Sequence, residues 1–118
     1  MIDIEDIRLY SLSMPHATED LPFGPDTLAF RIGGKIFGLM SLDQPDCQRI
    51  NLKCDPEKVE DLRANYSFII PGYHMNKTHW NTILLNEDAE IRMVKRLIED
   101  SYQIVRESLS KSIKATLK

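Results

Sequence analysis

The sequence predicts a single α+β domain in which helices cover one face of an antiparallel sheet. Two alternating segments flank Gly33-Gly34, and a third alternating segment occupies 49–54. Helical periodicity occurs over 3–14 and again from Ile91 onward. The length of 118 residues fits one domain, and a composition of 42% hydrophobic and 28% charged residues is typical of a globular protein.

The chain is expected to begin with a short helix and an ordered loop. Ile4 and Ile7 lie on one helical stripe, and the acids at the start of this segment complement the helix dipole. Pro15 is expected to end the helix. Turn-forming residues over 21–26 then predict a loop in which Phe23 anchors the chain to the core.

Gly33-Gly34 predicts a β-hairpin, because the central positions of a two-residue turn favour positive φ. This turn would pair Arg31 with Ile36, Phe30 with Phe37, and Leu28 with Leu39. Paired residues share a face of the sheet. The helix-covered face is therefore expected to carry Leu28, Phe30, Phe37 and Leu39, and the opposite face Thr27, Ala29, Arg31, Gly38 and Met40.

Residues 49–54 predict a third strand followed directly by a helix. Alternation sends Ile50, Leu52 and Cys54 inward, and Arg49, Asn51 and Lys53 outward. Asp55 is a favourable N-cap, and Pro56 suits the first helical position. We therefore expect a short helix to start at Pro56.

A polar connection over 73–78 leads to a predicted fourth strand over 79–85, whose face assignment the pattern leaves open. The longest helix follows, with an apolar stripe formed by Ile91, Val94, Ile98, Val105 and Leu109. We expect this helix to cover the sheet and to leave the other sheet face available. The domain is expected to span 1–109, and the basic tail over 110–118 to fray or remain mobile.

Charge is distributed unevenly along the chain. Residues 1–26 hold six acids against one arginine, whereas 92–118 hold seven Lys or Arg against three acids. The net charge of -3 argues mildly against strong nonspecific binding to duplex DNA. The acidic N-terminus lacks the features of a signal peptide, and no apolar run approaches the roughly 18 residues of a membrane span. A cytoplasmic location with Cys47 and Cys54 reduced, and no membrane partner, is expected.

Three segments together resemble one known family. They read LPFGPDTLAFRIGGKIF over 21–37, RINLKCDPE over 49–57 and PGYHMNKTHWNT over 71–82. On these segments the chain is similar to members of the MmcQ/YjbR family, and the similarity extends over about residues 1–109.

The resemblance implies a frataxin-like (CyaY-like) α+β fold with a double-wing arrangement, for which a DNA-binding role has been proposed on structural analogy. It implies no catalytic residues. The positions that match the family's signature segments are Asn51, Lys53, Pro71, Gly72, His74, Asn76, Lys77, His79, Trp80 and Asn81.

A nucleic-acid interface is the first functional hypothesis. Binding requires cations for phosphates and, for single strands, an aromatic surface on which bases stack. The residues expected to supply this interface on the available sheet face are Arg31, Arg49, Asn51, Lys53, Lys77, His79 and Trp80. A solvated charged face with a core tryptophan is the structural alternative. The expected partner is DNA, and the protein is expected to be a non-enzymatic binding module.

A small-ligand or enzymatic pocket is the second hypothesis. The segment 74–81 gathers imidazole, carboxamide, ammonium and indole groups, and the pocket would be formed by His74, Asn76, His79, Trp80 and Asn81. In the structural alternative, Asn76 and Asn81 cap backbone groups of an irregular turn and Trp80 seals the sheet edge. A third use, docking of a protein partner on the basic last helix, stays open.

Neither a metal site nor a cofactor is predicted. The N-terminal acids have no fixed ligand spacing and are typical of a solvated face. His74 and His79 are five residues apart, off a common helical face, and lack an obvious third ligand.

Overall fold

The computed structural model describes residues 2–43, 47–72 and 75–117. Its elements run in the order α1 (Ile4–Leu12), β1 (Thr18–Asp20), β2 (Thr27–Ile32), β3 (Lys35–Ser41), β4 (Arg49–Lys53), α2 (Pro56–Asn65), β5 (Ile69–Pro71), β6 (Trp80–Leu84), α3 (Ile91–Glu107) and α4 (Lys111–Thr116). The α+β class is confirmed.

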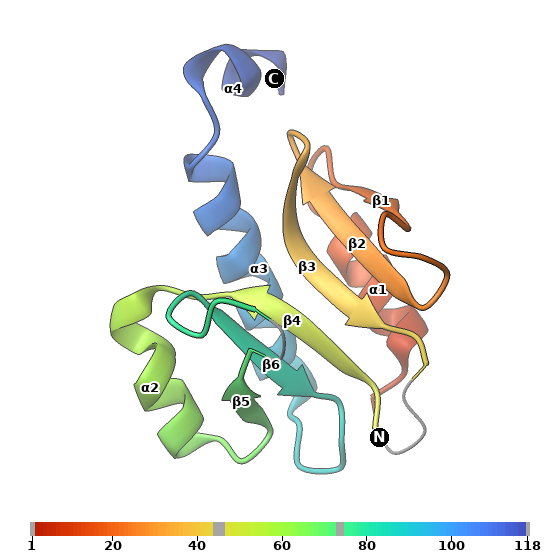
Figure 1. Cartoon of the computed structure of the whole chain (residues 1–118), viewed down its shortest axis with the longest axis vertical. Helices are drawn as coiled ribbons and strands as arrows, with labels where there is room; N and C mark the ends of the chain where they lie inside the picture. The colour runs from red at the N-terminus through yellow and green to blue at the C-terminus, as the bar shows by residue number, and fades with distance from the viewer. Residues whose placement is uncertain (1, 44–46, 73–74, 118) are drawn as a thin grey trace.

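Six strands form one antiparallel sheet with the order β1-β2-β3-β4-β6-β5. Helices α1 and α3 lie behind this sheet in Figure 1, and α2 lies beside the edge strand β5. The predicted elements are all present, but β1 and β5 were not predicted. Each has only three residues, which is too short for alternation to show in the sequence.

Local signals place the starts of α1 and α2 where the sequence predicted them. The Asp3 carboxylate accepts the Glu5 N–H at the start of α1, and the Asp55 carboxylate accepts the Glu57 N–H at the start of α2. Pro56 occupies the first turn of α2. At the end of the chain Ser110 caps α4, so the basic tail forms a short helix.

The hairpin carries a bulge that the sequence did not reveal. Arg31 pairs with Ile36 as predicted, but Phe30 pairs with Gly38 and Leu28 with Met40. The predicted pairs Phe30–Phe37 and Leu28–Leu39 are therefore wrong, because one extra residue of β3 lies between the two sets of pairs.

The bulge exchanges the faces of two side chains. Leu28, Phe30, Phe37 and Met40 join the buried core cluster beneath the helices. Leu39 instead pairs with Ala29 and shares the opposite face. The predicted faces of Leu39 and Met40 are thus wrong, since a slip of one residue turns a side chain to the other side of the sheet.

A serine of α3 fills the place where β3 and β4 diverge. Their ladder ends at the Gly38–Leu52 pair. Beyond it, the buried Ser101 hydroxyl donates to the Phe37 carbonyl at 2.5 Å and accepts the Lys53 N–H at 2.9 Å. The side chain supplies both strands with the hydrogen bonds that they do not make to each other.

The N-terminal acids are engaged in caps and ion pairs. Arg8 pairs with Glu5 and Glu19, which ties α1 to β1. The Tyr10 hydroxyl donates a hydrogen bond to Glu99 on α3. The Lys95 ammonium lies over the Tyr10 ring, 5.1 Å from the ring centroid. These contacts hold α1 against α3. Phe23, by contrast, is 66% exposed, so the prediction that it anchors the chain to the core is wrong.

Candidate functional site

Strand register places four of the predicted binding residues on the sheet face that α1 and α3 do not cover. Lys53 lies opposite Trp80, Asn51 opposite Thr82, and Arg49 opposite Leu84 in the β4–β6 ladder. Paired residues share a face. The register therefore settles the position that the sequence left open: the Trp80 side chain lies on the same face as Lys53, Asn51 and Arg49.

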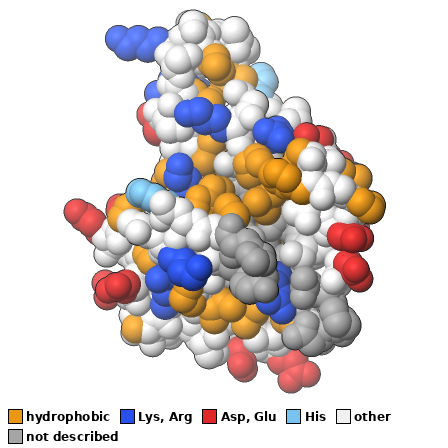
Figure 2. Space-filling view, in the orientation of Figure 1, with side chains coloured by type: hydrophobic (Ala, Val, Ile, Leu, Met, Phe, Trp, Pro, Cys, Tyr) orange, Lys and Arg blue, Asp and Glu red, His pale blue; other side chains and the backbone are white. Residues whose placement is uncertain are grey.

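The side chains at the centre of this face are buried. Ala29 and Thr82 are fully buried there and Leu39 is nearly so, although α1 and α3 pack on the other side. The cations lie toward the two ends of β4. Arg49 and Lys53 are four residues apart on one strand, which corresponds to about 13 Å at the rise of a β-strand. Figure 2 shows this face, with Lys and Arg side chains around an apolar patch and acidic side chains nearer the periphery.

The remaining predicted residues differ in how many hydrogen bonds and ion pairs they make and in how exposed they are. Arg31 donates from Nε to Asp20 and from Nη1 to the Gly34 carbonyl, both at 2.9 Å, so its charge is already paired. Asn51 accepts a hydrogen bond from the Thr82 hydroxyl across the sheet. Lys77 is exposed, while His79 and Trp80 are half-buried. Lys53 and Trp80 thus lie at one end of the face, and Lys77 is in the turn that leads into Trp80.

The segment before β6 is an irregular turn held by its own polar groups. The Asn76 side-chain carbonyl accepts the Thr78 N–H at 2.8 Å, and the Asn76 backbone carbonyl accepts the N–H groups of His79 and Trp80. Gly72 lies so close to this turn that a Cβ atom there would stand 2.8 Å from the Trp80 carbonyl oxygen. Close backbone approach explains a glycine at this position.

Arg63, on α2, is the residue that sequence reasoning missed. Its Nε donates to the Asn81 side-chain oxygen at 2.7 Å, and its Nη2 donates to the carbonyls of Lys77 and Trp80. One guanidinium therefore joins α2 to three positions of the segment 77–81. An arginine 18 residues before its main partner carries no local signal in the sequence.

Asn81 faces the helices instead of the binding face. It pairs with Leu52 in the ladder and is only 2% exposed. Its position therefore separates it from Trp80, which points to the other side. His74, the remaining member of the predicted pocket, lies outside the described residues.

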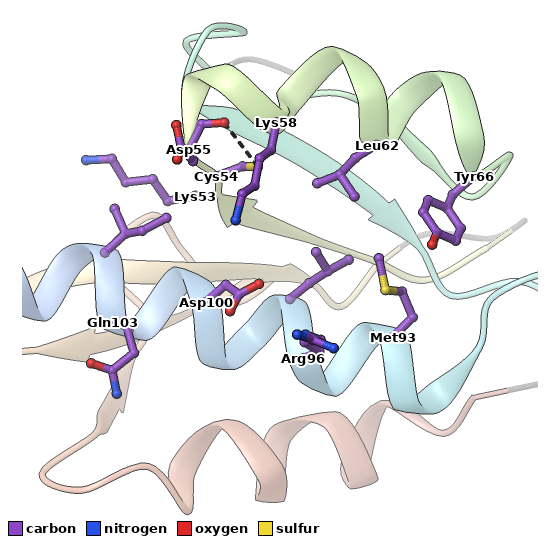
Figure 3. A pocket seen from close by; sticks show the side chains of 12 residues that line it. Lys53, Cys54, Asp55, Lys58, Leu62, Tyr66, Met93, Arg96, Asp100 and Gln103 are labelled. Atoms are coloured by element: carbon purple, nitrogen blue, oxygen red, sulfur yellow. Dashed lines mark hydrogen bonds between the residues drawn. The ribbon is translucent and has the colours of Figure 1, made fainter.

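A groove of about 440 Å³ opens between α2 and α3 on the helical side of the molecule. Figure 3 shows Lys58 reaching from α2 toward α3, and Leu62 and Tyr66 facing Met93. The groove is lined by Lys53, Cys54, Asp55, Lys58, Leu62, Tyr66, Met93, Arg96, Leu97, Asp100, Gln103 and Ile104. Of the predicted site residues, only Lys53 lines this groove.

The Cys54 thiol in the groove is kept in its neutral form. Burial raises its pKa, and the carboxylates of Asp55 and Asp100 raise it further. The thiolate is the nucleophilic form of cysteine. At neutral pH this thiol therefore contributes apolar surface to the groove instead of a reactive group.

No helix within 2–43, 47–72 and 75–117 is long and apolar enough to cross a membrane. This finding concerns the helices of the described segments alone.

Proteins of known sequence that are similar to this chain match it over most of its length. The chain is 38% identical over 107 residues to the protein YbdF of Escherichia coli O157:H7, covering 91% of this chain and 87% of YbdF. It is 25% identical over 100 residues to YjbR of Escherichia coli K12, covering 85% of this chain and 84% of YjbR.

Solved structures agree with the sequence comparison. The crystal structure of Deinococcus radiodurans protein DR2400, with a DUF419 domain, has a TM-score of 0.90 at 32% identity, over 99% of this chain and 88% of that one. A Pseudomonas syringae protein has a TM-score of 0.76 at 32% identity, over 87% of this chain and 98% of that one. The sequence profile of the YjbR family matches residues 12–104, and the chain therefore belongs to the YjbR family.

Proposed function

We propose that this protein binds DNA as a single strand, through the sheet face that carries Lys53 and Trp80. The pairing of these two residues across β4 and β6 is the observation that supports the proposal. An indole beside an ammonium offers a stacking surface for a base next to a cation for a phosphate.

The charge layout favours a single strand over a duplex. Lys53 lies opposite Trp80 and Lys77 precedes it by three residues, so these two lysines supply the cations nearest the indole, while Arg31 is already paired with Asp20. The whole chain carries a net charge of -3, which opposes the broad electrostatic contact that duplex binding uses. A short strand with splayed bases requires fewer phosphate contacts and gains from stacking.

Fluorescence anisotropy of a labelled oligothymidylate, titrated at several salt concentrations, tests the proposal. Phosphate contacts at Lys53 and Lys77 predict a slope of log K against log salt of about -1.4 for a single strand. A duplex of the same length should bind more weakly. Absence of salt-dependent binding at low ionic strength would exclude this function.

Two double variants test the location of the interface. Lys53→Ala with Lys77→Ala removes both of these cations, and the slope should fall close to zero. Lys111→Ala with Lys114→Ala removes the same charge from α4 and should leave the slope unchanged. Equal losses in both variants would show that charge alone, wherever it lies, governs binding, and the assignment to this face would be wrong.

Stacking is tested separately from charge. Trp80→Ala should weaken binding by about tenfold at all salt concentrations, because stacking on one base is worth about 1–3 kcal/mol. The slope should stay the same, since no cation is lost. Quenching of the single tryptophan by the oligonucleotide provides a second readout.

A further inference from the structure

We propose that the groove between α2 and α3 binds a small amphipathic monoanion, with an apolar body at one end and a carboxylate at the other. This site lies on the helical side of the sheet and shares Lys53, at the end of β4, with the DNA-binding face proposed above. Its volume of about 440 Å³ is within the range of small-molecule sites.

The groove changes character along its length, as Figure 3 shows. Leu62 and Tyr66 on α2 face Met93 on α3 at one end, and these three side chains also pack against the core. Lys58 and Asp100 lie toward the other end, and Arg96 lies between Asp100 and Met93. An occupant that is apolar at one end and polar at the other matches this gradient.

Charge selects an anion with a single negative charge. Three cations line the groove, contributed by the end of β4, by α2 and by α3: Lys53, Lys58 and Arg96. Asp55 and Asp100 oppose them, and the Asp55 carboxylate already caps α2. Three positive charges against two negative ones leave one positive charge, which a monoanion neutralises. A dianion would bind more weakly, because the groove has only one positive charge in excess and the two carboxylates would repel the second negative charge.

Arg96 and Lys58 are suited to hold the headgroup. Both side chains are exposed, and no hydrogen bond or ion pair engages either of them within the described segments. A guanidinium binds a carboxylate through two parallel hydrogen bonds, which fixes its orientation. The apolar part of the occupant would then extend toward Met93.

Displacement of anilinonaphthalene sulfonate by decanoate, followed by fluorescence on the full chain, tests this proposal. Decanoate should displace the probe, and decanol, which has the same chain without the charge, should be about tenfold weaker. Decyl phosphate, with a greater negative charge, should also be weaker than decanoate. Equal competition by decanol, or no displacement up to about 1 mM decanoate, would overturn the proposal.

Variants place the binding in this groove. Lys58→Ala with Arg96→Ala should weaken decanoate by about tenfold and leave decanol unchanged, because each exposed charge contributes up to about 1 kcal/mol. Lys111→Ala with Lys114→Ala is the control with equal charge loss and should bind like the unmodified protein. Equal affinity in both variants would refute the site.

Amide chemical shifts distinguish this site from surface adsorption. Decanoate should shift the amides around Leu62, Met93 and Arg96, which face the groove. Shifts centred instead on the exposed apolar loop of Leu21 and Phe23 would overturn the assignment. Trp80→Ala tests the DNA-binding face at a residue that does not line the groove, and Lys58→Ala with Arg96→Ala tests the groove at residues outside that face. Failure of one proposal therefore leaves the other measurable.

Discussion

Replacing Arg63 with alanine should destabilise the protein more than the loss of an ordinary surface arginine. The Arg63 side chain is half-buried, and its Nε donates at 2.7 Å to an oxygen of Asn81, which is 2% exposed. The Asn81 Nδ2 is also buried, and no residue within 2–43, 47–72 and 75–117 accepts a hydrogen bond from it. Removing the guanidinium would leave both polar ends of this buried amide unsatisfied.

The magnitude follows from that geometry. A hydrogen bond to a charged group contributes about 1.5–3 kcal/mol, and a buried group left unsatisfied costs a similar amount. We therefore expect Arg63→Ala to lower the free energy of unfolding by about 2–3 kcal/mol. With a urea dependence of about 1.5 kcal/mol/M, the midpoint should fall by roughly 1.5 M.

Urea unfolding followed by circular dichroism measures this change, and Arg92→Ala provides the control. Arg92 is exposed on α3, so its loss should alter stability by less than about 0.5 kcal/mol. A double-mutant cycle between Arg63→Ala and Asn81→Ala should give a coupling energy of at least about 1 kcal/mol. A coupling near zero would refute the reasoning, because the two side chains would then not depend on each other.

Three further predictions follow from single features of the fold. Ser101→Ala should lower the free energy of unfolding in urea by about 2–3 kcal/mol, because it removes the hydroxyl that bonds to both β3 and β4. The same change should speed hydrogen exchange of the Lys53 amide, and unchanged exchange would contradict the bridging role. Gly33→Ala should destabilise the protein more than Gly34→Ala. Both glycines have positive φ, but only at Gly33 would an added Cβ atom lie 2.6 Å from a Leu109 side-chain carbon. Equal losses of unfolding free energy in the two variants would exclude that clash. The hydrogen bond to Glu99 raises the pKa of Tyr10 to about 12, so the folded state holds this proton above pH 10; its contribution to stability is fully present below about pH 10 and falls as pH rises toward 12. Ultraviolet titration should show a late tyrosine that Glu99→Gln shifts to lower pH, and an unchanged titration in that variant would contradict the contact.

Several elements could be predicted because their causes lie within a few residues. Asp55 followed by Pro56 predicted the start of α2, and Gly33-Gly34 predicted the turn between β2 and β3. Alternation over 49–53 predicted β4 and the common face of Arg49, Asn51 and Lys53. These signals act locally, so they can be recognised before any tertiary contact is known.

The site was predicted in part. The residues of β4 do share a face, but the position of Trp80 opposite Lys53 came only from the β4–β6 register. Asn81 was grouped with Trp80 in one pocket, although successive strand residues point to opposite faces. Whether the two proposed sites act as inferred stays a prediction for the binding experiments above.

By itself, the sequence determined the α+β class, the main helices, the hairpin and the family segments, because periodicity, caps and turn residues are local properties. Only the tertiary structure decided the bulge in β3, the two edge strands, the Arg63–Asn81 contact and the groove between α2 and α3. The bulge lies within the hairpin itself, whereas the others depend on residues brought together from separate parts of the chain. Ser101 reaches Lys53 across 48 positions, for example, and no pattern in either neighbourhood specifies that meeting.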